Sequence, residues 1–127
     1  MATRESFTAG QILTAAECTN LAVSMIALNA ITTTTYTTVL GDDGKLVTLD
    51  NASAITVTIP PNGTVAYGIG TQINFMQLGA GQVTIAPGAG VTLRSAGSKL
   101  KTNGQYAVAT CCKIATDTWV VIGNLAA

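Results

Sequence analysis

The sequence contains no histidine and few charged side chains. Acidic and basic residues together make up 9% of its 127 positions, six of each sign, so the net charge at pH 7 is zero. An average soluble protein has about 25% charged residues. Catalysis needs acid–base groups or a nucleophile held by partners, and this chain supplies few of them. The adjacent acids Asp42 and Asp43 are explained by a turn. We therefore expect no enzymatic activity and no catalytic residues.

The groups that bind metals and cofactors are scarce as well. A tetrahedral metal site needs four ligands, and the chain has neither histidine nor a Cys-x-x-Cys motif. Three Gly-x-Gly pairs occur, but none continues to the third glycine of a dinucleotide-binding loop. They are Gly68/Gly70, Gly79/Gly81 and Gly88/Gly90. We interpret each pair as a turn, the first also as a bulge or a close approach of two backbones, and expect no metal and no cofactor.

Other absences limit the partners. No basic patch is present, so we expect no nucleic-acid binding. Hydrophobic residues reach 48%, but Thr, Asn, Gln or Gly interrupts every apolar run well before the roughly 20 residues of a membrane span. The N-terminus does not have the pattern of a secretory signal, which predicts a cytoplasmic start. The cysteines, Cys18, Cys111 and Cys112, are odd in number, and we expect small buried hydrophobic side chains rather than a disulfide.

The longest feature that is present is a charge-free stretch from Asn51 to Leu93. Within it, Ile55–Ile59 and Val83–Ala86 alternate apolar residues with threonine or alanine. This period of two is typical of a strand with one buried face. A segment this long without a charge predicts a β-core whose outer surface meets other protein.

A short helix is predicted ahead of the strands. Thr14 and Glu17 match a capping box, which favours a helix from about Ala15 to about Ala30. Apolar residues at alternating three- and four-residue spacings form a possible seam. They are Cys18, Leu21, Met25 and Leu28. The helix either packs on the chain's own sheet or joins identical helices around a symmetry axis, with the seam as the oligomer contact.

The run Thr32–Thr35 ends the helix, because consecutive β-branched residues favour extended chain. A hairpin is predicted around Gly41-Asp-Asp-Gly44. Short strands follow at intervals of about ten residues, which indicates an all-β sandwich or barrel. The expected strands are 36–40, 45–50, 55–59, 72–78, 83–86, 91–94, 99–101, 105–115 and 118–122. We expect a mainly β fold, an antiparallel sandwich or barrel-like domain at 36–127, preceded by a leader and one short α-helix at 1–35.

Two further expectations concern the C-terminal part. Trp119 is expected in the core, on the same side of its strand as Val121. Four cations gather near the end of the chain, most simply on a solvated edge, alternatively against an acidic partner. They are Arg94, Lys99, Lys101 and Lys113. A weak internal echo between Gly79–Ile85 and Gly88–Leu93 suggests two strands that stack in the same way.

Several motifs, taken in order, resemble a β-domain of tailed-bacteriophage virion proteins, found in tail fibres, tail-associated proteins and head appendages. The motifs are Gly44-Lys-Leu-Val-Thr-Leu-Asp-Asn51, Ala54-Ile-Thr-Val-Thr-Ile-Pro-Pro-Asn62, Gly70-Thr-Gln-Ile73, Gly79-Ala-Gly-Gln-Val-Thr-Ile85 and Thr116-Asp-Thr-Trp119. The resemblance covers roughly Tyr36 to Ala127. The leader Phe7–Ala16 resembles the segments by which phage appendages attach to the particle, which implies anchoring by Phe7, Ile12 and Leu13.

The resemblance implies a non-enzymatic virion component that is a homotrimer and binds the major capsid protein or another virion protein. Almost nothing lies between leader and β-domain, where a fibre that reaches a host receptor has a long shaft. This favours a capsid decoration (cement) protein or short head fibre. The alternatives are a tail-associated or tail-fibre module that contacts host glycans, and a soluble binding domain without a role in a particle.

Overall fold

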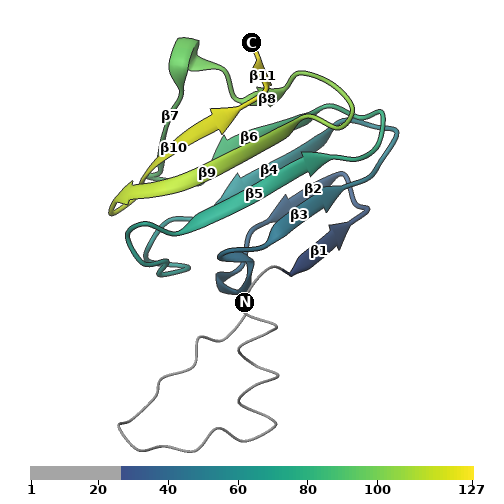
Figure 1. Cartoon of the computed structure of the whole chain (residues 1–127). Helices are drawn as coiled ribbons and strands as arrows, with labels where there is room; N and C mark the ends of the chain where they lie inside the picture. The colour runs from purple at the N-terminus through teal and green to yellow at the C-terminus, as the bar shows by residue number, and fades with distance from the viewer. Residues whose placement is uncertain (1–26) are drawn as a thin grey trace, which may run out of the picture.

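The structure, a computed structural model, describes residues 27–127, which form two β-sheets packed face to face (Figure 1). Sheet A has the strand order β1-β3-β5-β9-β10-β7 and sheet B the order β11-β8-β6-β4-β2. The strands of sheet A are β1 (Leu28–Ile31), β3 (Leu46–Leu49), β5 (Gln72–Gln77), β7 (Thr92–Arg94), β9 (Val108–Ala115) and β10 (Thr118–Gly123). Those of sheet B are β2 (Thr35–Thr37), β4 (Ile55–Ile59), β6 (Val83–Pro87), β8 (Lys101–Thr102) and β11 (Leu125–Ala126). Two short 3-10 helices, η1 (Leu40–Asp42) and η2 (Ala96–Ser98), connect strands.

Strands β1 to β6 alternate between the two sheets, odd-numbered strands lying in sheet A and even-numbered strands in sheet B. Within each sheet these strands run parallel to one another: β1 pairs with β3 and β3 with β5, and β2 pairs with β4 and β4 with β6. Leu46 pairs with Asn74 and Ile55 with Val83, 28 positions apart in each case, whereas Leu28 pairs with Leu46 and Thr35 with Thr56, 18 and 21 positions apart. The chain therefore winds as a coil in which each turn adds one strand to each sheet.

The winding ends after β6. Strand β9 lies antiparallel to β5, and β10 lies antiparallel to β9, whereas β7 runs parallel to β10 at the edge of sheet A. In sheet B, β8 and β11 are added in antiparallel pairings. Both sheets are therefore mixed, and the expectation of an antiparallel sandwich is wrong in strand direction. The prediction of a mainly β fold is confirmed.

The core lies between the sheets and consists of alternate residues from both. Sheet A contributes Val47, Leu49, Ile73, Phe75, Ala109, Cys111, Trp119 and Val121, and sheet B contributes Ile55, Val57, Ile59, Val83 and Ile85. Trp119 is 1% exposed, which confirms it as a core residue. Burial raises the pKa of the Cys111 thiol, with a smaller contribution from Cys112, so this thiol stays protonated as a small apolar group.

Consecutive turns of the coil stack backbone on backbone at two glycines. Gly79 and Gly81 lie opposite Asn51 and Ser53, and the Gly81 N–H donates to the Asn51 carbonyl oxygen at 2.8 Å. A Cβ at Gly81 would lie 1.9 Å from the Ser53 carbonyl oxygen. The close approach suggested for Gly68/Gly70 is therefore found at Gly79/Gly81, since a Cβ at Gly68 or Gly70 would meet nothing within 4 Å.

The predicted helix is wrong at its C-terminal end. Residues Leu28–Ile31 form β1, and each of them pairs with a residue of β3. The inward-facing Asn29 is a weak helix former, and its side chain is held by Asp42 and Tyr36. Tertiary pairing thus overrides the apolar helical spacing. Strand pairing starts at Leu28, ahead of Tyr36, and the part of the predicted helix from Ala15 to residue 26 lies outside the described residues.

The predicted hairpin around Gly41–Gly44 is also wrong. The backbone turns at Gly44 with φ +77, as the Asp-Gly pair favours, but the flanking strands β2 and β3 belong to opposite sheets. The segment is a crossing between layers. The two segments of the internal echo, Gly79–Ile85 and Gly88–Leu93, likewise lead into strands of opposite sheets, because β6 lies in sheet B and β7 in sheet A.

Among residues 27–127, no helix has the length and apolar character needed to cross a membrane.

Candidate interaction surface

The outward side of sheet A is a broad face with almost no charge. On a strand every second side chain points away from the core, and the burial pattern identifies which. These residues, termed the outer A face, are Leu28, Ala30, Leu46, Thr48, Gln72, Asn74, Met76, Thr92, Arg94, Val108, Thr110, Cys112, Ile114, Thr118, Val120 and Ile122. Arg94 is their single charged member, so an extended surface of the protein offers apolar and neutral polar groups to its surroundings.

Strand registers order the outer A face into transverse rows. One row runs across five strands, from Leu28 on β1 to Ile122 on β10. Its inner members are Leu46, Asn74 and Thr110, and the Thr110 hydroxyl donates to Asn74 Oδ1 at 2.7 Å. Leu28 is 67% exposed and Ile122 55% exposed. The row thus begins and ends in large apolar side chains that sheet A itself leaves uncovered.

The outward side of sheet B differs in chemistry. Its residues, termed the outer B face, are Thr35, Thr37, Thr56, Thr58, Thr84, Ala86 and Lys101. Threonines Thr35, Thr56 and Thr84 occupy neighbouring positions on three parallel strands. Threonine hydroxyls remain hydrated while the branched side chain suits a strand, so this face needs no cover. The apolar surface is concentrated on sheet A.

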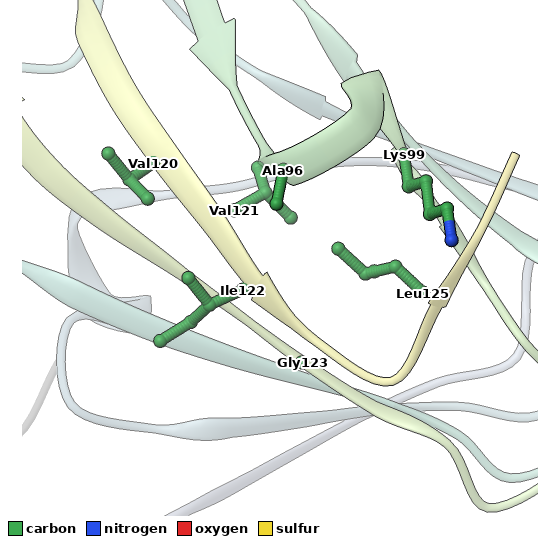
Figure 2. Close-up of a pocket in the computed structure, with 7 residues that line it drawn as sticks. All are labelled: Ala96, Lys99, Val120, Val121, Ile122, Gly123 and Leu125. Atoms are coloured by element: carbon green, nitrogen blue, oxygen red, sulfur yellow. The ribbon is translucent and has the colours of Figure 1, made fainter.

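A groove continues the outer A face at the end of β10 (Figure 2). This terminal groove has a volume of about 460 Å³ and is lined by Ala96, Lys99, Val120, Val121, Ile122, Gly123 and Leu125. Figure 2 shows Ala96, Val121 and Leu125 between β10 and the η2 segment, with the Lys99 side chain alongside. Since Val120 and Ile122 belong to both surfaces, the groove is an extension of the outer A face.

Most of the charges outside the core lie near opposite edges of the sandwich. Near β1, Asp43 and Asp50 flank strand β3 together with Lys45. Near β7 and β8, Arg94, Lys99 and Lys101 are all exposed. Between these edges, β4, β5 and β6 add no charge and β9 adds only the buried Lys113. The half-buried Asp117 lies beside β7, where its carbonyl oxygen accepts from the Thr92 N–H. One edge is therefore basic, and the opposite edge carries more acidic than basic groups.

Asp42 is fully buried within a hydrogen-bonded cluster beside β1. Its carboxylate accepts bonds from Asn29 Nδ2 at 2.9 Å, Tyr36 Oη at 2.5 Å and the Val39 N–H at 3.0 Å. Asn29 Nδ2 also donates to Tyr36 Oη at 2.9 Å. Burial, followed by the bond and charge of Asp42, raises the pKa of Tyr36 well above its ordinary value. A carboxylate enclosed in this way fixes β1 against η1 and has no access to a substrate.

Lys113 is buried too, at 2% exposure, contrary to the expected solvated edge. Its ammonium group donates to Asn62 Oδ1 at 2.8 Å and to the Tyr67 carbonyl oxygen at 2.7 Å. Asp117 Oδ1 accepts from the Asn62 N–H at 2.6 Å. The inward position of Lys113 on β9 allows this, because the loop between β4 and β5 supplies the oxygens. The other three cations of the predicted group are exposed, as expected.

Of the residues predicted to make contacts, the structure describes Leu28 alone. It lies on the edge strand β1 and points outward from sheet A, where it is free to meet a partner. The anchoring residues Phe7, Ile12 and Leu13 and the seam residues Cys18, Leu21 and Met25 lie outside the described residues. The seam as a helical feature fails at Leu28, since that residue is in a strand.

Sequence reasoning missed the terminal groove and the outer A face. One signal was present: on β9, the outward Val108, Cys112 and Ile114 are apolar, as are the inward Ala109 and Cys111. A strand that is apolar on both faces indicates cover on both sides. The groove had no signal, because Ala96 and Leu125 are brought beside β10 by tertiary folding.

Among residues 27–127 no group of three or more His, Cys, Asp or Glu side chains is placed to hold a metal ion. No family model matches the chain, and no curated protein matches its sequence.

Proposed function

We propose that the protein is a non-enzymatic structural component of a tailed-bacteriophage virion, a homotrimer that decorates the capsid or forms a short head fibre. The observation that supports it is the outer A face, which presents sixteen outward residues with one charge among them. An extended surface with exposed apolar side chains and almost no charge is typical of a protein–protein interface. The motifs that resemble phage appendage domains suggest which assembly provides the partner.

The activity proposed is mechanical. Burying the outer A face against other copies and against the shell removes apolar surface from water, which holds the assembled state together. Obligate interfaces are large and contain few charged residues, which agrees with the single charge of this face. The buried clusters around Asp42 and Lys113 keep the ends of the coil in place, so the face is presented as a rigid surface.

The first experiment measures self-association of the full-length protein by native mass spectrometry and light scattering at micromolar concentration. We expect a trimer. A monomer at this concentration contradicts the proposal and favours a soluble binding domain that acts outside a particle.

The second experiment places the protein on the particle. Immunogold labelling of virions of the phage that encodes it should mark the head. Label on the tail instead supports a tail-associated module, and virions without label contradict a structural role in the particle. Deleting residues 1–13, which include Phe7, Ile12 and Leu13, should abolish binding to empty capsids and leave the trimer intact.

A further inference from the structure

The two ends of the outer A face differ in shape. At one end, Leu28 projects from β1, a short edge strand whose far side is unpaired in sheet A. At the other end, the terminal groove forms a concave apolar surface beside β10. Because Leu28 and the groove lie at opposite ends of the same sheet, Leu28 can reach only the groove of a different copy of the chain.

Strand β1 has the features of an edge that is covered by protein. Its residues, Leu28-Asn-Ala-Ile31, include no charge and no proline, the devices that usually protect an exposed edge from pairing. Asn29 and Ile31 face inward, and Leu28 and Ala30 are exposed. Within residues 27–127 its outer N–H and C=O groups pair with no other strand, so this edge is suited to strand addition.

The edge of sheet A at β10 is also open where the groove lies. Strand β7 pairs with β10 only from Thr118 to Val120, whereas β10 continues to Gly123. Beyond Val120, η2 and β11 stand away from β10, and the groove occupies the space between them (Figure 2). A strand that entered there would lie beside the last residues of β10.

The distribution of charge also favours contact between the β1 edge of one copy and the terminal groove of another. Asp50 N–H donates to the Ile31 carbonyl oxygen and Leu46 N–H to that of Ala27, so the β3 flanks bearing Asp50 and Asp43 lie near the two ends of β1. Lys99 lines the groove, and Arg94 and Lys101 are on the same edge. Whichever direction a docked β1 runs, one of the two carboxylates comes close to the basic edge.

We infer that the β1 edge of one copy docks in the terminal groove of the next, with Leu28 packed against Ile122 and Leu125. Contacts of this kind join two different surfaces, so repeating them closes a ring or extends a filament. A ring of three copies agrees with the proposed trimer, on whose existence this inference rests. The occupant of the groove is thus a second copy of the same chain.

The test uses two full-length variants, Leu28→Arg and Ile122→Arg, each of which blocks one side of the contact. Native mass spectrometry should show each variant alone as a monomer, because a buried unpaired charge is costly. Mixed in equal amounts, they should form a dimer that contains one chain of each and nothing larger. The Leu28→Arg chain keeps an unaltered groove and the Ile122→Arg chain keeps an unaltered β1 edge, so one contact can form. Thr56→Arg on the outer B face is the matched control and should keep the wild-type mass.

The outcomes separate this inference from the proposed function. If wild-type protein is oligomeric but either variant keeps its mass, or the mixture stays monomeric, the contact is wrong and self-assembly stands. If wild-type protein is itself a monomer, both fail. Circular dichroism checks folding. Should the arginine variants unfold, Leu28→Ser and Ile122→Ser should each weaken self-association at least about tenfold, and unchanged association overturns the contact.

Discussion

The rings of Tyr67 and Trp119 meet edge to face, with centroids 5.3 Å apart and an interplanar angle of 87°. Trp119 belongs to β10 in sheet A, and Tyr67 to the long connection between β4 and β5. The Tyr67 hydroxyl donates to the Val39 carbonyl oxygen at 2.6 Å and lies 2.9 Å from Thr38 Oγ1. The Tyr67 side chain thus connects the segment after β2, where the chain crosses between the sheets, to strand β10 of sheet A.

Replacing Tyr67 by phenylalanine should retain the contact with Trp119 and remove the hydroxyl. The buried Thr38 hydroxyl and the part-buried Val39 carbonyl oxygen then lose a partner, so we expect the free energy of unfolding to fall by about 1 to 2 kcal/mol. Urea denaturation measures it. Tyr106 is exposed, and Tyr106→Phe is the matched control that should leave stability unchanged within about 0.5 kcal/mol. Equal stabilities of the two variants contradict the role given to the Tyr67 hydroxyl.

Alkaline pH should weaken the same part of the structure. Burial is the main cause that raises the pKa of Tyr67 to about 12, and the charges of Asp42 and Asp43 add to it, while Thr38 acts in the opposite direction. An unfolded tyrosine titrates near pH 10, so above that pH the unfolded chain releases a proton that the folded chain retains. The stability associated with the neutral hydroxyl is therefore present below about pH 10 and is lost as pH rises toward 12.

The measurement compares urea midpoints of wild-type protein and Tyr67→Phe from about pH 8 to about pH 11. Both lose stability, since Tyr36 and Cys111 also have raised pKa values through burial. The difference between them should narrow above about pH 10, because only wild-type protein loses the contribution of Tyr67. A difference that stays constant over this range contradicts the assignment.

Asp42→Asn should destabilise the protein by about 2 to 3 kcal/mol, the magnitude expected for hydrogen bonds to a buried charged group. An amide places an NH₂ group where donors from Asn29, Tyr36 and Val39 converge on two oxygens. The neighbouring Asp43→Asn is the control and should change stability by less than about 0.5 kcal/mol. Denaturant unfolding measures both. Amide hydrogen exchange in β1 should accelerate in Asp42→Asn alone, and unchanged protection there would count against anchoring of β1 by this carboxylate.

Several central strands could be predicted from local pattern, but β1 was expected as helix, β11 was not expected, and the strand expected at 36–40 ends at Thr37. The expected strand Ile55–Ile59 agrees with β4 residue for residue, because threonines alternate with buried residues and Pro60 follows. Which strands pair with one another could not be predicted. Alternation determines which face a side chain takes but not which strand lies beside it, so the coil and its parallel neighbours were not visible. Successive turns differ in length, with paired residues 18 or 21 positions apart at first and 28 positions apart later, so no fixed period in the sequence reveals the coil.

The interaction surface was predictable in its chemistry and not in its position. The charge-free stretch from Asn51 to Leu93 indicated cover by other protein, but much of it is core, and the outer A face also draws on β1, β9 and β10. Lys113 looked like a solvated cation because Asn62 and Tyr67, the residues that satisfy it, are about fifty positions away in sequence. Contacts at that range depend on topology, which one sequence does not specify.

The stacking of consecutive turns should make Gly81 intolerant of substitution by alanine. The Cβ of Gly81→Ala would meet the Ser53 carbonyl oxygen at 1.9 Å, and relief requires movement of two backbone segments that are also joined by the bond from Gly81 N–H to Asn51. Overpacking against backbone of this kind should cost about 3 kcal/mol or more. Gly63→Ala is the matched control: its Cβ meets nothing within 4 Å, and loss of chain entropy in the unfolded state should leave it neutral or up to about 1 kcal/mol more stable. Calorimetry measures the stability of both variants. If Gly81→Ala is as stable as Gly63→Ala, consecutive turns do not stack at this position.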